Sequence, residues 1–178
     1  MDGENALELC TELLGLEEFE VVESQREAGG KAWHLTIVPR MAVGLCPHCG
    51  RISEERHECH QREILDLPIG RCLTKLKLRR WQFHCGHCRR FFTPHYQAIA
   101  AGTHATERLL ERMVEMIGFS DIRNAGRFFG VAEKTLEHWY YEFLERKRKR
   151  SQETKEPIRS LGIDELSLKK STDSSAAC

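Results

Sequence analysis

The sequence contains no long apolar run, and this absence excludes a transmembrane helix. No stretch of its 178 residues approaches the roughly 18 consecutive apolar residues that such a helix needs. The acidic N-terminus also lacks the basic flank and apolar stretch of a secretory signal. Hydrophobic residues make up 40% of the chain and charged residues 30%, which is typical of globular proteins. We therefore expect a cytoplasmic protein without membrane contact.

The chain also lacks net charge, but this total hides an asymmetry. Residues 1–30 hold nine acids and one base, Arg26, so this segment carries a charge of −8. Because the whole chain sums to zero, residues 31–178 carry +8. Such a division indicates a basic working part behind an acidic N-terminal segment, although ordinary surface charge would give the same totals.

Internal repeats are absent apart from two short cysteine motifs. These are Cys46-Pro47-His48-Cys49-Gly50 and Cys85-Gly86-His87-Cys88, and Gly50 and Gly86 permit the tight turns that such motifs need. In a chain without a signal peptide, paired cysteines at this spacing more often bind metal than form disulfides. Four thiolates complete the tetrahedral shell of a structural Zn²⁺. The predicted zinc ligands are therefore Cys46, Cys49, Cys85 and Cys88.

Other metal-binding side chains lie close to these motifs in the sequence. His48 and His87 lie within the motifs, where the turn is expected to point their rings away from the shared ion, but a mixed Cys/His site stays open. His57, Cys59 and His60 could bind a second ion. A redox role is less well supported, because no thioredoxin-like βαβ pattern surrounds either motif.

Apolar periodicity outlines the remaining elements. It predicts a helix over residues 5–16, a strand over 33–38, and a half-buried strand with a basic outer face over 75–80. The pattern is helical from 103 to 150, and a short strand is expected over 158–168. We therefore expect an α+β fold in which a small antiparallel zinc-ribbon-like module is followed by a helical helix-turn-helix domain.

The expected domain boundaries follow from these elements. An acidic N-terminal helix and lead-in occupies residues 1–30, and the zinc-binding β module occupies 31–98. The helix-turn-helix domain with its basic end covers 99–150. Residues 151–178 begin with a polar linker.

Residues 121–140 carry the pattern of a helix-turn-helix. Ala125 and Gly126 are small enough for two helices to cross closely, and Gly130 supplies the turn. The second helix would then present four side chains to the major groove of double-stranded DNA, namely Glu133, Lys134, Glu137 and His138. An ordinary pair of helices joined by glycine would show the same spacing.

A run of five bases ends this second helix, Arg146, Lys147, Arg148, Lys149 and Arg150. If all five bind DNA phosphates, log K falls with log salt with a slope of roughly −4 from this run alone. The alternative is a solvated helix end whose cations interact favourably with the helix dipole. The acid-free segment 71–90 offers a second basic surface for DNA.

The order of these features resembles the N-terminal part of the ISL-three group of insertion-sequence transposases. After the helix-turn-helix comes Leu161-Gly162-Ile163-Asp164-Glu165, and segments 64–68 and 76–85 also look like that group's pattern. The resemblance covers roughly residues 5 to 170. It implies sequence-specific binding to the terminal inverted repeats of the element, in DNA transposition. It also implies a ribonuclease-H-like domain with an Asp-Asp-Glu triad and two Mg²⁺ ions, in which Asp164 matches the first catalytic Asp.

The sequence departs from this family after Asp164. Only 14 residues follow it, so 151–178 are interpreted as a linker and the truncated start of a catalytic domain. The second Asp and the Glu are missing, so we expect no strand transfer from this chain and a role for Mg²⁺ only in an intact family member. A homodimer is expected, because paired sites increase affinity.

Two other functions stay open. The chain could be a stand-alone zinc and helix-turn-helix regulator that represses an intact transposase by occupying its sites. It could also be an interaction module that does not bind DNA and uses its acidic N-terminal helix as a partner surface. Sequence-selective, salt-sensitive DNA binding separates the first two functions from the third.

Overall fold

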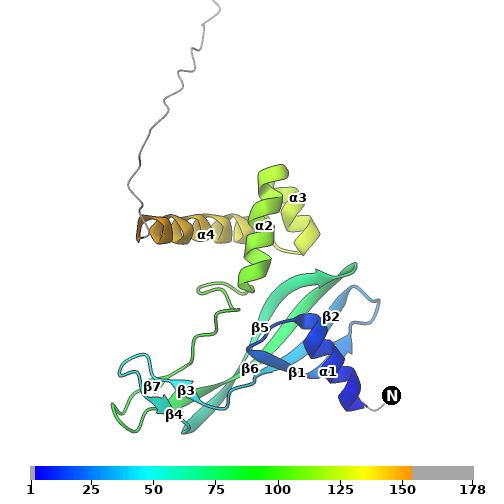
Figure 1. Cartoon of the computed structure of the whole chain (residues 1–178). Coiled ribbons are helices and arrows are strands. Elements are labelled where there is room, and N and C mark those ends of the chain that lie inside the picture. The colour runs from blue at the N-terminus through cyan, green and yellow to red at the C-terminus, as the bar shows by residue number, and fades with distance from the viewer. Residues whose placement is uncertain (1–2, 154–178) are drawn as a thin grey trace, which may run out of the picture.

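A mixed β-sheet forms the body of the protein in a computed structural model, which describes residues 3–153. The sheet contains five strands, in the order β1-β2-β6-β5 with β7 paired to the end of β6 (Figure 1). Their bounds are β1 Phe19–Arg26, β2 Ala32–Pro39, β5 Arg56–Ile69, β6 Cys72–His84 and β7 Phe91–Phe92.

The strand pairing shows why the sheet is mixed. Both β1–β2 and β5–β6 are antiparallel hairpins. The two hairpins join through β2 and β6, which run parallel and place Ala32 opposite Leu73 and Ile37 opposite Leu78. This parallel pairing connects segments about forty residues apart in the sequence.

The expected small antiparallel zinc-ribbon-like module followed by a helical helix-turn-helix domain is therefore wrong. The chain is α+β, but its main sheet is large and mixed, and the N-terminal segment contributes β1 to it. The zinc-ribbon expectation failed because the segment between the cysteine motifs forms two long strands, β5 with 14 residues and β6 with 13. These strands form a long hairpin, and the motifs occupy only one of its ends.

Helix α1, Gly3–Leu14, covers one face of the sheet (Figure 1). Leu14 packs with Phe19 of β1, Ile37 of β2 and Leu76 and Leu78 of β6 in one buried cluster. On β6, these buried leucines alternate with the exposed Lys77 and Arg79. The predicted half-buried strand with a basic outer face is thus confirmed.

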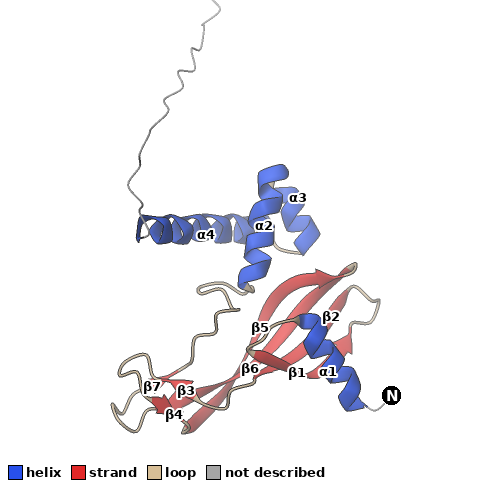
Figure 2. Cartoon of the chain, in the orientation of Figure 1, coloured by secondary structure: helices blue, strands red, loops and turns tan. Residues whose placement is uncertain are grey.

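Three further helices form a separate helical unit beside β5 (Figure 2). They are α2 Glu107–Phe119, α3 Ile122–Phe129 and α4 Glu133–Glu153. Their shared core includes Leu109, Leu110, Met113, Phe129, Leu136 and Trp139. Among residues 3–153, no helix has both the length and the apolar character needed to cross a membrane.

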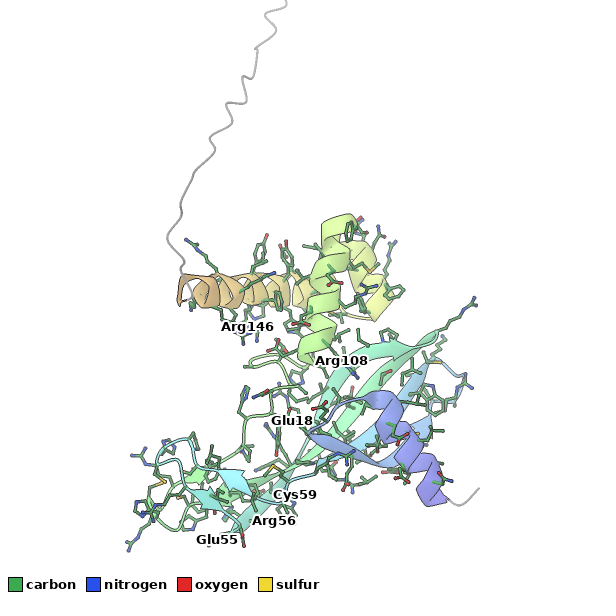
Figure 3. All side chains as sticks on the ribbon, in the orientation of Figure 1. Glu18, Glu55, Arg56, Cys59, Arg108 and Arg146 are labelled. Atoms are coloured by element: carbon green, nitrogen blue, oxygen red, sulfur yellow. The ribbon has the colours of Figure 1, made fainter. Side chains whose placement is uncertain are left out.

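Asp66 of β5 joins the sheet to the helical unit. This residue is only 4% exposed. It accepts hydrogen bonds from the Thr106 hydroxyl at 2.6 Å, from Arg108 Nε at 2.9 Å and from a second guanidinium nitrogen of Arg108. Figure 3 labels Arg108 at the end of α2 that meets the sheet. Because a buried carboxylate needs charged or hydrogen-bonding partners, these bonds hold the start of α2 against β5.

We predict that Asp66→Ala lowers the free energy of unfolding by about 2–4 kcal/mol, because Thr106 and Arg108 lose their buried partner. Chemical denaturation measures this change. Glu58→Ala is the matched control on the same strand, because Glu58 forms only an exposed pair with His60 at 3.7 Å and should cost less than about 1 kcal/mol. Equal losses in the two variants would contradict the role given to Asp66.

Candidate metal centre and nucleic-acid interface

Two similar turns present the four predicted cysteine ligands. The first lies between the short strands β3, Gly44–Leu45, and β4, Ile52–Ser53. In it the Cys46 amide donates to the Arg51 carbonyl at 2.9 Å and the Gly50 amide donates to the Cys46 carbonyl at 2.9 Å. The second turn, between β6 and β7, repeats both bonds: Cys85 to Arg90 at 2.9 Å and Arg89 to Cys85 at 2.7 Å.

The left-handed residue of each turn is the one directly after its second cysteine. Gly50 has a φ of 68° and Arg89 a φ of 57°. The expectation for Gly50 is confirmed, but in the second turn the left-handed conformation falls on Arg89 and not on Gly86. Since a side chain rarely adopts this conformation, Arg89 shows that the second turn is held in shape by the structure around it.

The four thiols converge on one point, and they could hold a metal ion. All four sulfur atoms lie within 4.8 Å of one another. The Cys46–Cys88 and Cys49–Cys85 sulfur pairs, which each join one turn to the other, are both 3.6 Å apart. A tetrahedral ion with metal–sulfur bonds of about 2.3 Å places its sulfur ligands roughly 3.8 Å apart. The spacing of the sulfurs therefore fits a four-thiolate ion.

Aromatic packing holds the thiol cluster together. Cys46 and Cys85 are buried with Phe83 and Phe92, whose rings stack at 5.9 Å. Gly44 lies so close to these rings that an added Cβ would come within 2.9 Å of both. The turns are also linked through Ser53, whose hydroxyl donates to the His84 carbonyl at 2.6 Å.

The thiols differ in how readily they ionise. Backbone amides of Cys88 and His87 donate to the Cys85 sulfur and lower its pKa to about 6. Burial raises the pKa of Cys88 to about 12. The pKa of Cys49 is also raised: a hydrogen bond from the Arg51 amide lowers it, but burial and the neighbouring thiols outweigh that bond. At neutral pH Cys49 and Cys88 therefore keep their protons until a cation displaces them.

The histidines near the motifs do not join this cluster. In the part of the chain that the structure describes, the four cysteines are the only group of potential ligands that lie close enough to share an ion. His48 is 3.2 Å from Arg90, and His57 packs against the Phe91 ring at 4.5 Å. Cys59 is exposed, and His60 lies beside Glu58.

Helix α4 carries the residues expected to face DNA. Glu133, Lys134, Glu137 and His138 are all exposed. The helix is joined to α3 by a short turn in which Gly130 is left-handed, with a φ of 67°. At Gly126 an added Cβ would lie 2.7 Å from the Val131 carbonyl, so only glycine allows this crossing. Val131, Leu136 and Trp139 are buried, as the apolar pattern predicts.

The five bases at the end of α4 divide between two sides of the helix. Arg146 donates to Glu107 of α2 at 2.8 Å, and its side chain is only 28% exposed (Figure 3). A cleft of about 330 Å³ lies between α2 and α4, and it is lined by Arg146, Lys147 and Arg150 together with acids of α2. The last four bases of the run are all exposed, but Arg148 and Lys149 do not line this cleft. This division was not predicted from the sequence. With 3.6 residues per helical turn, residues 146 and 150 lie on one side of the helix, and 148 and 149 lie on the other.

Comparison with protein families, with curated proteins and with solved structures finds no match to this chain. Asp164, the residue that the transposase resemblance assigns to catalysis, lies outside the described residues. The site is therefore argued from the cysteine cluster and the surface of the helical unit.

We predict that the purified chain binds one equivalent of a tetrahedral thiophilic metal ion and that Cys85→Ser loses it, because three thiolates cannot close the shell. Elemental analysis and the thiolate absorption of a Co²⁺-substituted sample measure this. Cys10→Ser is the matched control, because Cys10 packs against the α1 core far from the cluster. Full metal retention in Cys85→Ser would contradict the assignment.

We also predict that metal affinity falls as the pH falls. The raised pKa values of Cys49 and Cys88 mean that at least two protons must leave when the ion binds at neutral pH. The logarithm of the apparent affinity should therefore rise by about 2 or more per pH unit between roughly pH 6.5 and 8. Competition with a chelator at several pH values measures the slope, and a pH-independent affinity would show that these thiols are not ligands.

Proposed function

We propose that this chain is a zinc-stabilised protein that binds double-stranded DNA sequence-specifically, as the resembled transposase group does at the terminal inverted repeats of its elements. The observation that carries the proposal is the crossing of α3 and α4. A tight left-handed turn at Gly130 joins the two helices, and the first turns of α4 leave their outer side chains exposed. In helix-turn-helix proteins the corresponding part of the second helix enters the major groove.

The side chains at this end of α4 suit base recognition. His138 and Lys134 can donate to the acceptors on guanine, and Glu137 can accept from the cytosine amino group. Glu133 is 3.5 Å from Arg123 of α3, which offsets the repulsion between this acid and phosphate. Arg127 of α3 is exposed as well, and it adds a base on the helix that would cross the DNA backbone.

The exposed bases supply the sequence-independent part of binding. Arg146 pairs with Glu107, and Lys147 and Arg150 line the cleft that they share with acids of α2. We therefore assign phosphate contacts within the basic run to Arg148 and Lys149 alone. Two such contacts correspond to a salt slope of roughly −2 from this run, against the −4 expected if all five bases took part.

Zinc is the proposed metal because the four ligands are all sulfur. Such a closed shell has no open position for substrate, which is typical of structural and not catalytic zinc. The four cysteines would hold the ion, and the ion would tie β3 and β4 to the far end of the β5–β6 hairpin. In this proposal zinc maintains the fold, while α4 contacts DNA.

We predict that His138→Ala reduces discrimination between the preferred and other sequences by about 1–3 kcal/mol, because it removes one contact to a base edge.

Arg148→Ala with Lys149→Ala should weaken binding to all sequences alike and make the salt slope less negative by about 1.8. Fluorescence anisotropy with duplexes selected by this protein, at several salt concentrations, measures both effects.

Arg51→Ala is the control for this experiment. Arg51 is an exposed base between β3 and β4, at the metal end of the β5–β6 hairpin and away from the helical unit (Figure 1). It should change neither specificity nor slope. If Arg51→Ala and the α4 variants had the same effects, DNA binding through α4 would be ruled out and only a general attraction to polyanions would remain.

A further inference from the structure

Two arginines lie side by side on the face of the sheet that α1 covers. Arg62 of β5 pairs across the sheet with Leu78 of β6, and Arg80 follows two residues later on β6. Residues two apart on a strand point to the same face, so the two guanidinium groups are diagonal neighbours. Burial and the nearby charge of Arg80 both lower the pKa of Arg62.

A cavity of about 170 Å³ opens above this arginine pair. The segment between β7 and α2 forms its other wall, and its lining includes Thr93, His95 and Tyr96. Figure 1 shows this segment running from the metal end of the hairpin to the helical unit. Within residues 3–153, no Asp or Glu lines the cavity.

The hydrogen bonds of the pair leave donors for a ligand. One guanidinium nitrogen of Arg62 donates to the Thr103 carbonyl. The Nε of Arg80 is buried and has no hydrogen-bond partner among the described residues. Glu18 lies beyond Tyr96, and its carboxylate accepts from the amides of Gln97 at 3.1 Å and Ala98 at 2.8 Å. This acid is therefore committed to the backbone.

Tyr96 adds a neutral donor to the cavity. Burial raises its pKa, an effect that the charge of Arg80 opposes. The hydroxyl thus keeps its proton at neutral pH and can donate to an anion.

We infer that this cavity binds a phosphate group, held between the guanidinium groups of Arg62 and Arg80. Guanidinium groups bind tetrahedral oxyanions through paired hydrogen bonds, and a bound dianion would offset the repulsion between the two arginines. The volume is below the roughly 300–1,000 Å³ of pockets for drug-sized ligands, which favours a single phosphate over a whole nucleotide. The phosphate could belong to a DNA backbone or be a free ion, and only the first source depends on the proposed function.

Inorganic sulfate is the probe for the first arm of the test, because it has the shape of phosphate but does not compete for zinc. Thermal unfolding of the zinc-loaded full chain is followed while sulfate replaces chloride at constant ionic strength. We expect a rise in Tm of about 3 °C that saturates at millimolar sulfate. Arg80→Gln should abolish this rise, whereas Arg79→Gln should keep it, because Arg79 lies on the opposite face and lines a different cavity.

The second arm distinguishes the two sources of phosphate. If the site binds DNA, Arg80→Gln makes the salt slope of DNA binding less negative by about 0.9; if it binds a free anion, the slope stays unchanged while the sulfate response is lost. A sulfate response that is absent from the natural chain, or equal in Arg80→Gln, would overturn the inference. Should Arg80→Gln fail to fold, Arg80→Lys, which keeps the charge but loses the paired donors, should weaken the sulfate response. The sulfate arm needs no DNA, so it stands even if the chain binds none.

Discussion

Four sulfur atoms lie within 4.8 Å of one another, and the structure at this end of the β5–β6 hairpin depends on how their repulsion is relieved. Four thiolates at this distance repel one another strongly, so the cluster needs either protons or a cation. The raised pKa values of Cys49 and Cys88 mean that these two thiols keep their protons in the absence of an ion. A tetrahedral cation would replace those protons. The two turns meet through these sulfurs, Ser53, the contact of His48 with Arg90 and a few aromatic contacts. An ion there would therefore tie β3 and β4 to the long β5–β6 hairpin.

The molecule is held together at two further places, one with a buried carboxylate and one with a half-buried carboxylate. Asp66 anchors α2 to β5 through Thr106 and Arg108. Glu18 anchors the segment before α2 through the amides of Gln97 and Ala98. These bonds give the helical unit a defined position beside the sheet. A defined position of α4 would suit the proposed recognition of a DNA duplex.

Local patterns in the sequence predicted the parts of the structure that depend on near neighbours. The Cys-x-x-Cys spacing identified all four residues of the cluster, and Gly126 and Gly130 identified the crossing of α3 and α4. The alternation from Lys75 to Arg79 identified β6. Each of these features follows from turn geometry or from a strand or helix period, so a short segment carries the information.

The features that the sequence did not predict depend on distant partners. Pairing of β2 with β6 leaves no local pattern, because parallel strands are joined by long connections, and so the size and mixed character of the sheet were missed. Arg146 was interpreted as a phosphate ligand. Its partner Glu107 lies 39 residues away, so no local pattern indicates their ion pair. The proximity of Arg62 to Arg80 was not predicted, since only the β5–β6 register brings them together.

The central claim, that a zinc-stabilised chain reads DNA sequence through α4, is tested most directly by selection from random-sequence DNA. The zinc-loaded full chain is incubated with a random duplex library at physiological salt, and the bound fraction is sequenced over several rounds. The account predicts enrichment of a defined motif, which disappears in a Lys134→Ala, His138→Ala double variant that still holds its metal. Bound DNA that stays random, or a motif that survives unchanged in the double variant, would contradict it.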